Sequence, residues 1–493
     1  MRWVLAALLL WLLVGPRLDL PVAGLRVEDL LLAAMALLCL LHVRPITRPS
    51  AMTFAVLAVA ATGVLSALVA AGRGTLDPVT AVLYAVRPVE YWVAFPAALL
   101  LLRSATALWT RRLEVVLATT TVLQAAFAVV QYYFAIPIGF SHAAYTRAAG
   151  LTVGPYELGA ISAALVVYWV ARGRWVLASV SVIALAASIS RISILAAAVA
   201  LAILTVAWLV RQVRAIRRQG VREAFLPYTR SRARVAVSVI AVGTAGLVLA
   251  FTLGLIRGPD FSLGQNTAGP APVAEPSEAA VSETPTPTPT ASATSAPTSD
   301  LPAPPAESVS SRFASTSVLG SWDVAAGLAA SVAPPQTSAQ YADIAYAHIN
   351  DFVNAGSAVS SGSEPSNLVR FFRWHLILDT VDDPSEVVFG LGPSFVGPSV
   401  DGSYLRFFAD GGILGVLAWL ALIVMWLRRS PFWMVCVTIS LLIGALFIDI
   451  VYAERPMVLY WLLLAMATAG GAAARARRAA DQDVAAHDDA VRA

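Results

Sequence analysis

Long apolar runs separated by short polar connections occupy most of the 493-residue chain. Because a bilayer core is crossed by about 20 apolar residues, and by fewer near the interface, each run is a candidate membrane helix. By this criterion the sequence predicts about 12 membrane helices, with the first one uncleaved. The predicted spans are residues 3–15, 28–43, 51–71, 80–102, 113–135, 155–171, 174–190, 192–210, 234–256, 411–427, 431–449 and 456–470.

The composition agrees with a membrane protein. Hydrophobic residues make up 58% of the chain and charged residues only 13%, and the mean hydropathy is +0.73; soluble domains average about a quarter charged residues. The net charge of +4 comes with arginine as the basic residue throughout, since the sequence has no lysine. Arginines spread over many connections are explained by membrane topology, and we expect no nucleic-acid partner.

Arginine placement also predicts the orientation. The connection from Arg211 to Arg234 carries eight arginines, which places it in the cytoplasm by the positive-inside rule. Both termini are then cytoplasmic, and residues 257–410 lie outside. Arg17, Arg26 and Arg73 are exceptions, but the opposite orientation would create many more.

This orientation predicts an all-α polytopic membrane protein with one large extracytoplasmic loop. The first part of this loop, residues 257–309, is rich in Pro, Thr, Ser and Ala and forms a predicted tether. It lacks apolar side chains to bury, so we expect it to be disordered. The later part of the loop regains aromatic residues and should form short helices on the outer membrane face. The predicted parts are helices 1–9 in residues 1–256, the Pro/Thr/Ser/Ala-rich tether in 257–309, the folded loop in 310–410, helices 10–12 in 411–470 and a cytoplasmic tail in 471–493.

The stretch from Arg370 to Gly415 combines arginines, aromatic residues, a glycine-rich turn and an Asp-Gly pair before an apolar run. Its spacing resembles the O-antigen ligase and polymerase superfamily. The ligases of that family carry His, then Asn, Ser or Gln, nine residues, Gly, two residues, and Gly, Thr or Tyr. Counted from Asp401, Gly412 and Gly415 fall at the expected positions, whereas Asp401-Gly402 replaces the His-Asn pair.

The resemblance extends over most of the chain, since Arg147 with Gly150 and Pro155, and Ser190-Arg191, look like other outer-face motifs of the superfamily. It implies a glycosyltransferase in the bacterial cytoplasmic membrane, with its active site facing outside. The implied donor is an undecaprenyl-diphosphate-linked glycan, and the acceptor is a sugar hydroxyl of a second glycan. Loss of the ligase histidine favours polymerisation over ligase-like transfer to a lipid or protein acceptor.

Arginines on the outer side have no topological explanation and suit a diphosphate. The guanidinium group binds phosphate oxygens in a bidentate way and stays protonated, so the chemistry needs no metal or other cofactor. The predicted diphosphate ligands are Arg147, Arg191, Arg370 and Arg373. Arg87 is a secondary candidate, and its alternative is an interfacial position or an ion pair with a carboxylate such as Glu90.

Asp401 is the predicted catalytic base, because a carboxylate can take the proton of an acceptor hydroxyl. The alternative is that Asp401-Gly402 forms only a turn. Further candidates for the site are Glu157, Asp410 and Tyr404, with Asp449 as another possible base.

Other features have ordinary explanations. Asp382-Asp383 before a proline favours a solvated turn over a metal site, and His348 and His375 suit surface or packing positions. The turn Gly390–Pro393 either reverses the chain or positions the outer segment over a cavity. A lipid-linked glycan flippase would predict repeated halves with broken helices, which the sequence lacks; a scaffold displaying a stalk leaves the outer arginines unexplained.

The predicted orientation can be tested with single cysteines at positions 290 and 217, in a background that lacks Cys39 and Cys436. We expect an impermeant maleimide to label position 290 in intact cells and to leave position 217 unlabelled, because the first lies outside and the second inside. Labelling of position 217 before the membrane is opened would overturn the assignment of the outer site.

Overall fold

The computed structural model describes residues 2–15, 26–42, 51–103, 106–134, 148–224, 318–345, 365–397 and 400–492. Of these described residues 84% are helical, and none lies in a strand. Five helices are long and apolar enough to cross a membrane, which is consistent with a helical membrane protein. They cover Ala51–Gly72, Pro78–Leu102, Ala107–Phe134, Arg191–Arg211 and Ser403–Arg428.

The helices before the predicted tether are α1 (Arg2–Val14), α2 (Val27–His42), α3 (Ala51–Gly72), α4 (Pro78–Trp92), α5 (Ala94–Leu102), α6 (Thr106–Phe134), α7 (Pro155–Ala171), α8 (Trp175–Ser188) and α9 (Arg191–Ala224). Those after it are α13 (Val318–Ala330), α15 (Pro365–Thr380), α16 (Pro384–Phe389), α17 (Ser403–Arg429), α18 (Phe432–Gly444), the 3-10 helix η2 (Ile450–Tyr452) and α19 (Glu454–Arg492).

Helices occupy eleven of the twelve ranges that the apolar pattern predicts. The remaining range, 234–256, and the tether lie outside the described residues. That all twelve segments cross a membrane stays a prediction, because several of these helices are short. The clearest difference is α17, which begins at Ser403 instead of the predicted residue 411, so Arg406 and Asp410 lie within the helix.

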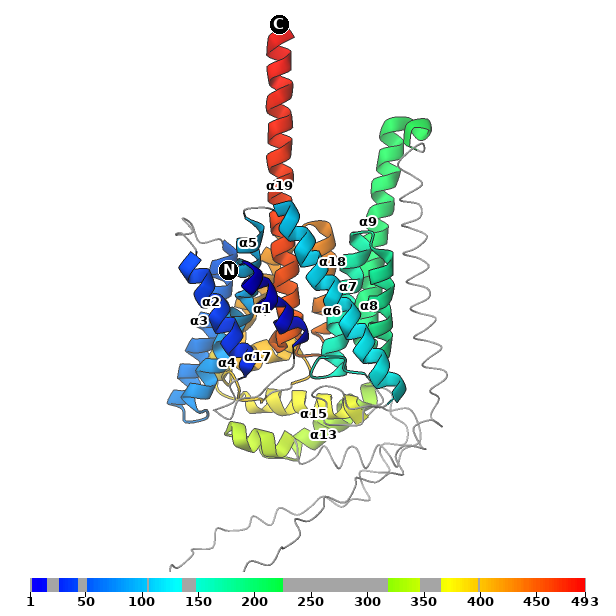
Figure 1. The fold of residues 1–493 in the computed structure, drawn as a ribbon. Coiled ribbons are helices and arrows are strands. Elements are labelled where there is room, and N and C mark those ends of the chain that lie inside the picture. Colours follow the sequence, from blue (N-terminus) through cyan, green and yellow to red (C-terminus); the bar gives the residue numbers. More distant parts are fainter. Residues whose placement is uncertain are drawn as a thin grey trace, which may run out of the picture.

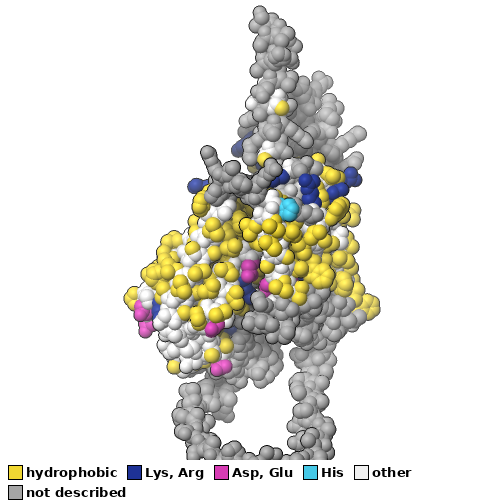
Figure 2. All heavy atoms as spheres, turned by 60° about the vertical axis from the view of Figure 1, so that its left-hand side comes forward, with side chains coloured by type: hydrophobic (Ala, Val, Ile, Leu, Met, Phe, Trp, Pro, Cys, Tyr) yellow, Lys and Arg dark blue, Asp and Glu magenta, His cyan; other side chains and the backbone are white. Residues whose placement is uncertain are grey.

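The bundle is built around α7 and the first part of α19 (Figure 1). Nearly every residue of α7 from Leu158 to Val170 is buried, and so is the α19 stretch from Met457 to Ala467. Helices that are apolar on all sides belong in the interior. The outer helices present a broad hydrophobic band with arginines along one edge (Figure 2), the pattern of a surface that faces lipid tails.

Two short helices, α13 and α15, lie side by side across one end of the bundle (Figure 1). They cover a separate hydrophobic core, in which Phe372 and Leu376 pack with Phe395 and Val400. The C-terminal parts of α9 and α19 project from the opposite end (Figure 1). Short helices are therefore present in the described parts of residues 310–410, and the assignment of this segment to an extracytoplasmic loop stays a prediction.

A kink in α17 fits against the glycine-rich turn. Gly412 adopts φ 58° and ψ −155° inside the helix, and the turn begins at Gly390, whose φ is 82°. The amides of Leu391 and Gly392 donate to the carbonyl of Ala409 over 2.7 and 3.2 Å, an acceptor that a regular helix pairs four residues later. The glycine-rich turn therefore does more than reverse the chain, since it supports the break in α17.

Replacing Gly412 by alanine should destabilise this junction. The new Cβ would lie 2.4 Å from the backbone of Val388, and the positive φ adds strain of about 1–3 kcal/mol for a residue with a side chain. Gly411→Ala is the matched control, because its Cβ would meet no atom within 4 Å. We expect the midpoint of thermal unfolding in detergent to be clearly lower for Gly412→Ala than for the wild type and unchanged for Gly411→Ala. Equal midpoints for the two variants would contradict the packing of Gly412 against Val388.

Candidate functional site

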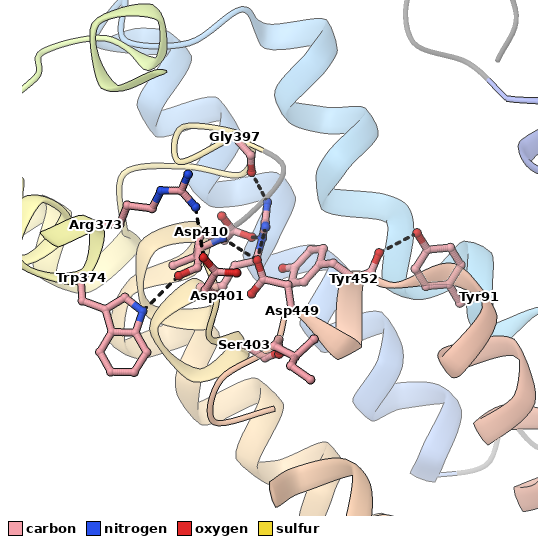
Figure 3. A network of polar contacts seen from close by, with 12 residues as sticks. Tyr91, Arg373, Trp374, Gly397, Asp401, Ser403, Asp410, Asp449 and Tyr452 are labelled. Carbon is pink, nitrogen blue, oxygen red and sulfur yellow. Dashed lines mark hydrogen bonds and ion pairs between the residues drawn. The ribbon is translucent and has the colours of Figure 1, made fainter. Parts of the chain in front are cut away.

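Arg373 and Asp401 form an ion pair at the end of the bundle that α13 and α15 cover. Arg373 comes from α15, and Asp401 lies two residues before α17 (Figure 3). The guanidinium NH1 of Arg373 lies 3.1 Å from Oδ2 of Asp401. The arginine side chain is 7% exposed and the aspartate side chain 25% exposed, so the carboxylate keeps access to the surroundings.

The backbone around Asp401 is held in an unusual conformation. Asp401 has φ 57°, in the left-handed region, which aspartate adopts more readily than most residues. The indole Nε1 of Trp374 donates to the carbonyl of Val400 over 3.0 Å, and a Cβ on Gly402 would lie 3.2 Å from the ring of Trp374. Asp401-Gly402 is thus a turn, as one interpretation of the sequence holds, and its carboxylate also points to Arg373.

A second cluster surrounds the buried guanidinium of Arg406, whose side chain is 1% exposed. Its NH1 lies 3.0 Å from Oδ2 of Asp449, and its Nε lies 3.4 Å from Oδ2 of Asp410. NH2 donates to the carbonyl of Gly397 over 2.6 Å, and the group stands 4.5 Å from the centre of the Tyr452 ring. These contacts join α17 to the preceding loop and to the α18–α19 connection.

The two clusters are linked through Asp449. Its Oδ2 also accepts the amide of Val400 over 2.6 Å, so the residue before Asp401 is fixed to the Arg406 cluster. The hydroxyl of Ser403 donates to the carbonyl of Ile448 over 2.8 Å, and its amide donates to Ala445 over 2.9 Å. The turn that carries Asp401 is therefore fastened on both sides.

Arg370 lies one helical turn before Arg373 on α15 and reaches toward α7. Its NH2 donates to the hydroxyl of Tyr156 over 3.2 Å. The start of α9 packs near the same end of α7, because a Cβ on Gly159 would lie 2.6 Å from Oγ of Ser193. Arg191 begins α9 there and is exposed.

The other predicted site residues lie in different surroundings. Arg147 and His348 fall outside the described residues. Arg87 lies 4.1 Å over the ring of Tyr84, Glu157 accepts the amide of Val153 in its own turn, and Tyr404 donates to the carbonyl of Leu442. The partner of Arg87 lies in α4, that of Glu157 lies just before α7, and that of Tyr404 lies in α18, so none of these three contacts involves Asp401.

Asp382 and Asp383 precede α16, where Asp383 is the N-cap. Its carboxylate accepts the amide of Ser385 over 2.7 Å, and this backbone hydrogen bond lowers the pKa of Asp383. The described residues contain no group of three acidic, His or Cys side chains placed to hold a metal.

Arg73, an exception to the topology rule, donates to Ser385 over 2.6 Å and pairs with Glu386 over 3.3 Å. His375 packs against Trp322, with ring centres 4.2 Å apart.

Arg406 is the important residue that the sequence analysis missed. It was assigned to the outer loop, because the apolar pattern placed the helix start at residue 411. The available signal was the spacing of Arg406 and Asp410, four residues apart beside an apolar run, which fits an ion pair on one helix face.

Comparison of the chain with protein-family models, with curated proteins and with solved structures finds no match.

Removing the Arg406 charge should destabilise the protein strongly. Arg406→Gln leaves two buried carboxylates without their cation, a loss that typically costs about 3–5 kcal/mol. Adding Asp410→Asn to this variant should restore part of the stability, because it removes one uncompensated charge. Thermal unfolding of the single and double variants tests the coupling; additive losses in the double variant would contradict the ion pair.

Proposed function

We propose that the protein is a membrane glycosyltransferase that uses a polyprenyl-diphosphate-linked oligosaccharide as donor and a sugar hydroxyl as acceptor. The observation that carries this proposal is the pairing of Arg373 with the partly exposed carboxylate of Asp401. One group can bind phosphate oxygens, and the other can accept a proton. Arg370 on the same helix adds a second guanidinium near this pair.

The ion pair suggests how binding of the donor could free the carboxylate of Asp401 to act as the base. In the free protein the guanidinium of Arg373 is paired with the carboxylate of Asp401. A bound diphosphate competes for the guanidinium, because planar guanidinium groups bind phosphate oxygens in a bidentate way. Donor binding would then release Asp401 for the acceptor hydroxyl.

The transfer step balances in the following way. The acceptor oxygen forms a bond to the anomeric carbon as the bond from that carbon to the diphosphate oxygen breaks. The hydroxyl proton passes to Asp401, and the polyprenyl diphosphate leaves with the bonding electrons. Arginines that contact the leaving group stabilise the negative charge that develops on it.

The described arrangement is compatible with a site on the outer membrane face. The pair Arg373–Asp401 lies at the end covered by α13 and α15, whereas α9 and α19 project from the other end (Figure 1). Those projecting segments carry the arginine-rich sequences 211–222 and 475–478, which favour the cytoplasm. We therefore propose a multi-pass protein of a bacterial cytoplasmic membrane, with both termini inside.

Deletion of the gene in the native host distinguishes polymerisation from ligase-like transfer. We propose the polymerase, since a carboxylate stands where the ligases carry histidine. Size analysis of lipid-linked and surface glycans should then reveal accumulated single repeat units. Full-length chains that stay unattached would favour the ligase, and an unchanged glycan profile would remove the support for either transfer.

Substitutions in the ion pair test the assigned roles. Asp401→Asn keeps the size of the side chain and removes the base, so glycan transfer should fall by about 100-fold or more. Arg373→Ala should lose roughly 10- to 100-fold, as expected for a charge-assisted hydrogen bond, and Arg373→Lys should restore only part of it because lysine lacks the planar fork.

The matched control for these variants is Arg73→Lys. Arg73 also pairs with a carboxylate near α16, but it lies outside the proposed site, so its replacement should leave transfer near the wild-type rate. Turnover of purified lipid-linked donor is the measurement. Near-wild-type transfer by Asp401→Asn would make Asp401 a turn residue only.

A further inference from the structure

Arg112, near the start of α6, lies in the angle between two indole rings. Its guanidinium carbon is 4.3 Å from the centre of the Trp3 ring and 4.7 Å from that of Trp109. The two rings meet edge to face, with their centres 5.5 Å apart. Trp109 is buried, whereas Trp3 on α1 is 64% exposed. Cation–π contacts therefore hold the guanidinium at the surface without supplying a negative charge to balance it.

Three exposed arginines lie close to Arg112, because α1, α5 and α6 pack against one another and their adjoining ends are basic. Together with Arg112 they form a basic patch, which consists of Arg2, Arg103, Arg111 and Arg112. Within the part of the chain that the structure describes, none of the four forms an ion pair. Glu114, the next carboxylate along α6, already accepts from Nε of Arg172 over 2.9 Å.

Exposed apolar side chains continue from the basic patch along the same two helices. On α6, Leu108 and Val115 are exposed, and their spacing of seven residues puts them on the helix face of the two patch arginines between them. On α1, Val4 and Trp11 are exposed and have the same spacing. Such side chains make up the hydrophobic band that arginines border along one edge (Figure 2). The surface is thus cationic where α1 and α6 begin and apolar along their length.

A phospholipid with a net negative charge matches both parts of this surface. Its phosphate oxygens can accept from planar guanidinium groups, and its acyl chains can cover the apolar face. A zwitterionic phospholipid brings an ammonium group of its own, which four unpaired arginines disfavour. A free phosphate would leave the apolar face uncovered. Exposed tryptophans such as Trp3 also favour the level of the lipid head groups.

We propose that the basic patch binds the head group of an anionic phospholipid, with the acyl chains along α1 and α6. α6 begins at the end of the bundle from which α19 projects (Figure 1), away from the end covered by α13 and α15. In the proposed orientation the lipid belongs to the cytoplasmic leaflet, where anionic lipids attract basic segments. Lipid binding rests on charge and shape alone, so it does not depend on glycan transfer.

Native mass spectrometry of the purified full-length protein in a non-ionic detergent tests the proposal. Phosphatidylglycerol and phosphatidylcholine with the same acyl chains are titrated separately, and bound lipid per chain is counted. We expect one phosphatidylglycerol to bind about tenfold or more tightly than phosphatidylcholine, and added salt to weaken it because the contact is ionic. The double variant Arg111→Gln/Arg112→Gln should lose roughly 30-fold in affinity, at about fivefold for each arginine.

The matched control is Arg174→Gln/Arg214→Gln, which removes the same charge from exposed arginines of the α7–α8 connection and α9. It should bind phosphatidylglycerol nearly as the wild type does. If the Arg111→Gln/Arg112→Gln variant does not fold, Arg103→Gln is compared with Arg174→Gln, and only the former should lose about fivefold.

Three results would overturn the proposal. Equal affinity of the wild type for the two lipids would show that the charge of the head group is not recognised. Equal losses in the patch and control variants would show general attraction to a basic surface. Displacement of the lipid by inorganic phosphate, compared with chloride at equal ionic strength, would make the patch a site for free phosphate.

Discussion

The buried guanidinium of Arg406 is the interaction on which the end of the bundle covered by α13 and α15 depends. A charge that leaves water is tolerated only when other groups replace its solvation. Arg406 obtains these groups from its own helix, from Gly397 and from Asp449. Because the three partners belong to separate segments, the requirement to solvate one charge brings these segments together.

The position of Asp401 follows from that requirement. Asp449 binds both Arg406 and the amide of Val400, so the turn before α17 is placed by the same charge cluster. The left-handed conformation of Asp401 then directs its carboxylate toward α15. A substitution at Asp449 would therefore reach Asp401 through the backbone without touching its side chain.

The sequence predicted the helices well, because a membrane helix needs only a sufficiently long apolar run. The range 155–171 coincides with α7, and 51–71 differs from α3 by one residue. The start of α17 was predicted eight residues late, since Arg406 and Asp410 look like loop residues until their mutual pairing is known. Whether every helix crosses a bilayer depends on surroundings that apolar length alone does not determine.

The candidate site was predictable as a set of residues but not as a set of contacts. The stretch from Arg370 to Gly415 already brought together arginines, Asp401 and the glycines. That Arg373 rather than Arg370 pairs with Asp401, and that Gly390 packs on Gly412, depends on how α15, α16 and α17 meet in space. Such pairings are set by tertiary packing, which one sequence without aligned relatives does not reveal.

The ion pair Arg373–Asp401 and the cluster around Arg406 differ in how far their carboxylates are exposed. Arg406 is enclosed, and separating it from Asp410 and Asp449 would leave both carboxylates without their cation. This cluster is therefore suited to hold the surrounding segments in one arrangement. Asp401 is 25% exposed, and ion pairs at accessible positions contribute little to stability. Under the proposed function the Arg373–Asp401 pair is the one that would exchange its partner for a ligand, whereas Arg406 would keep the surrounding turn in place.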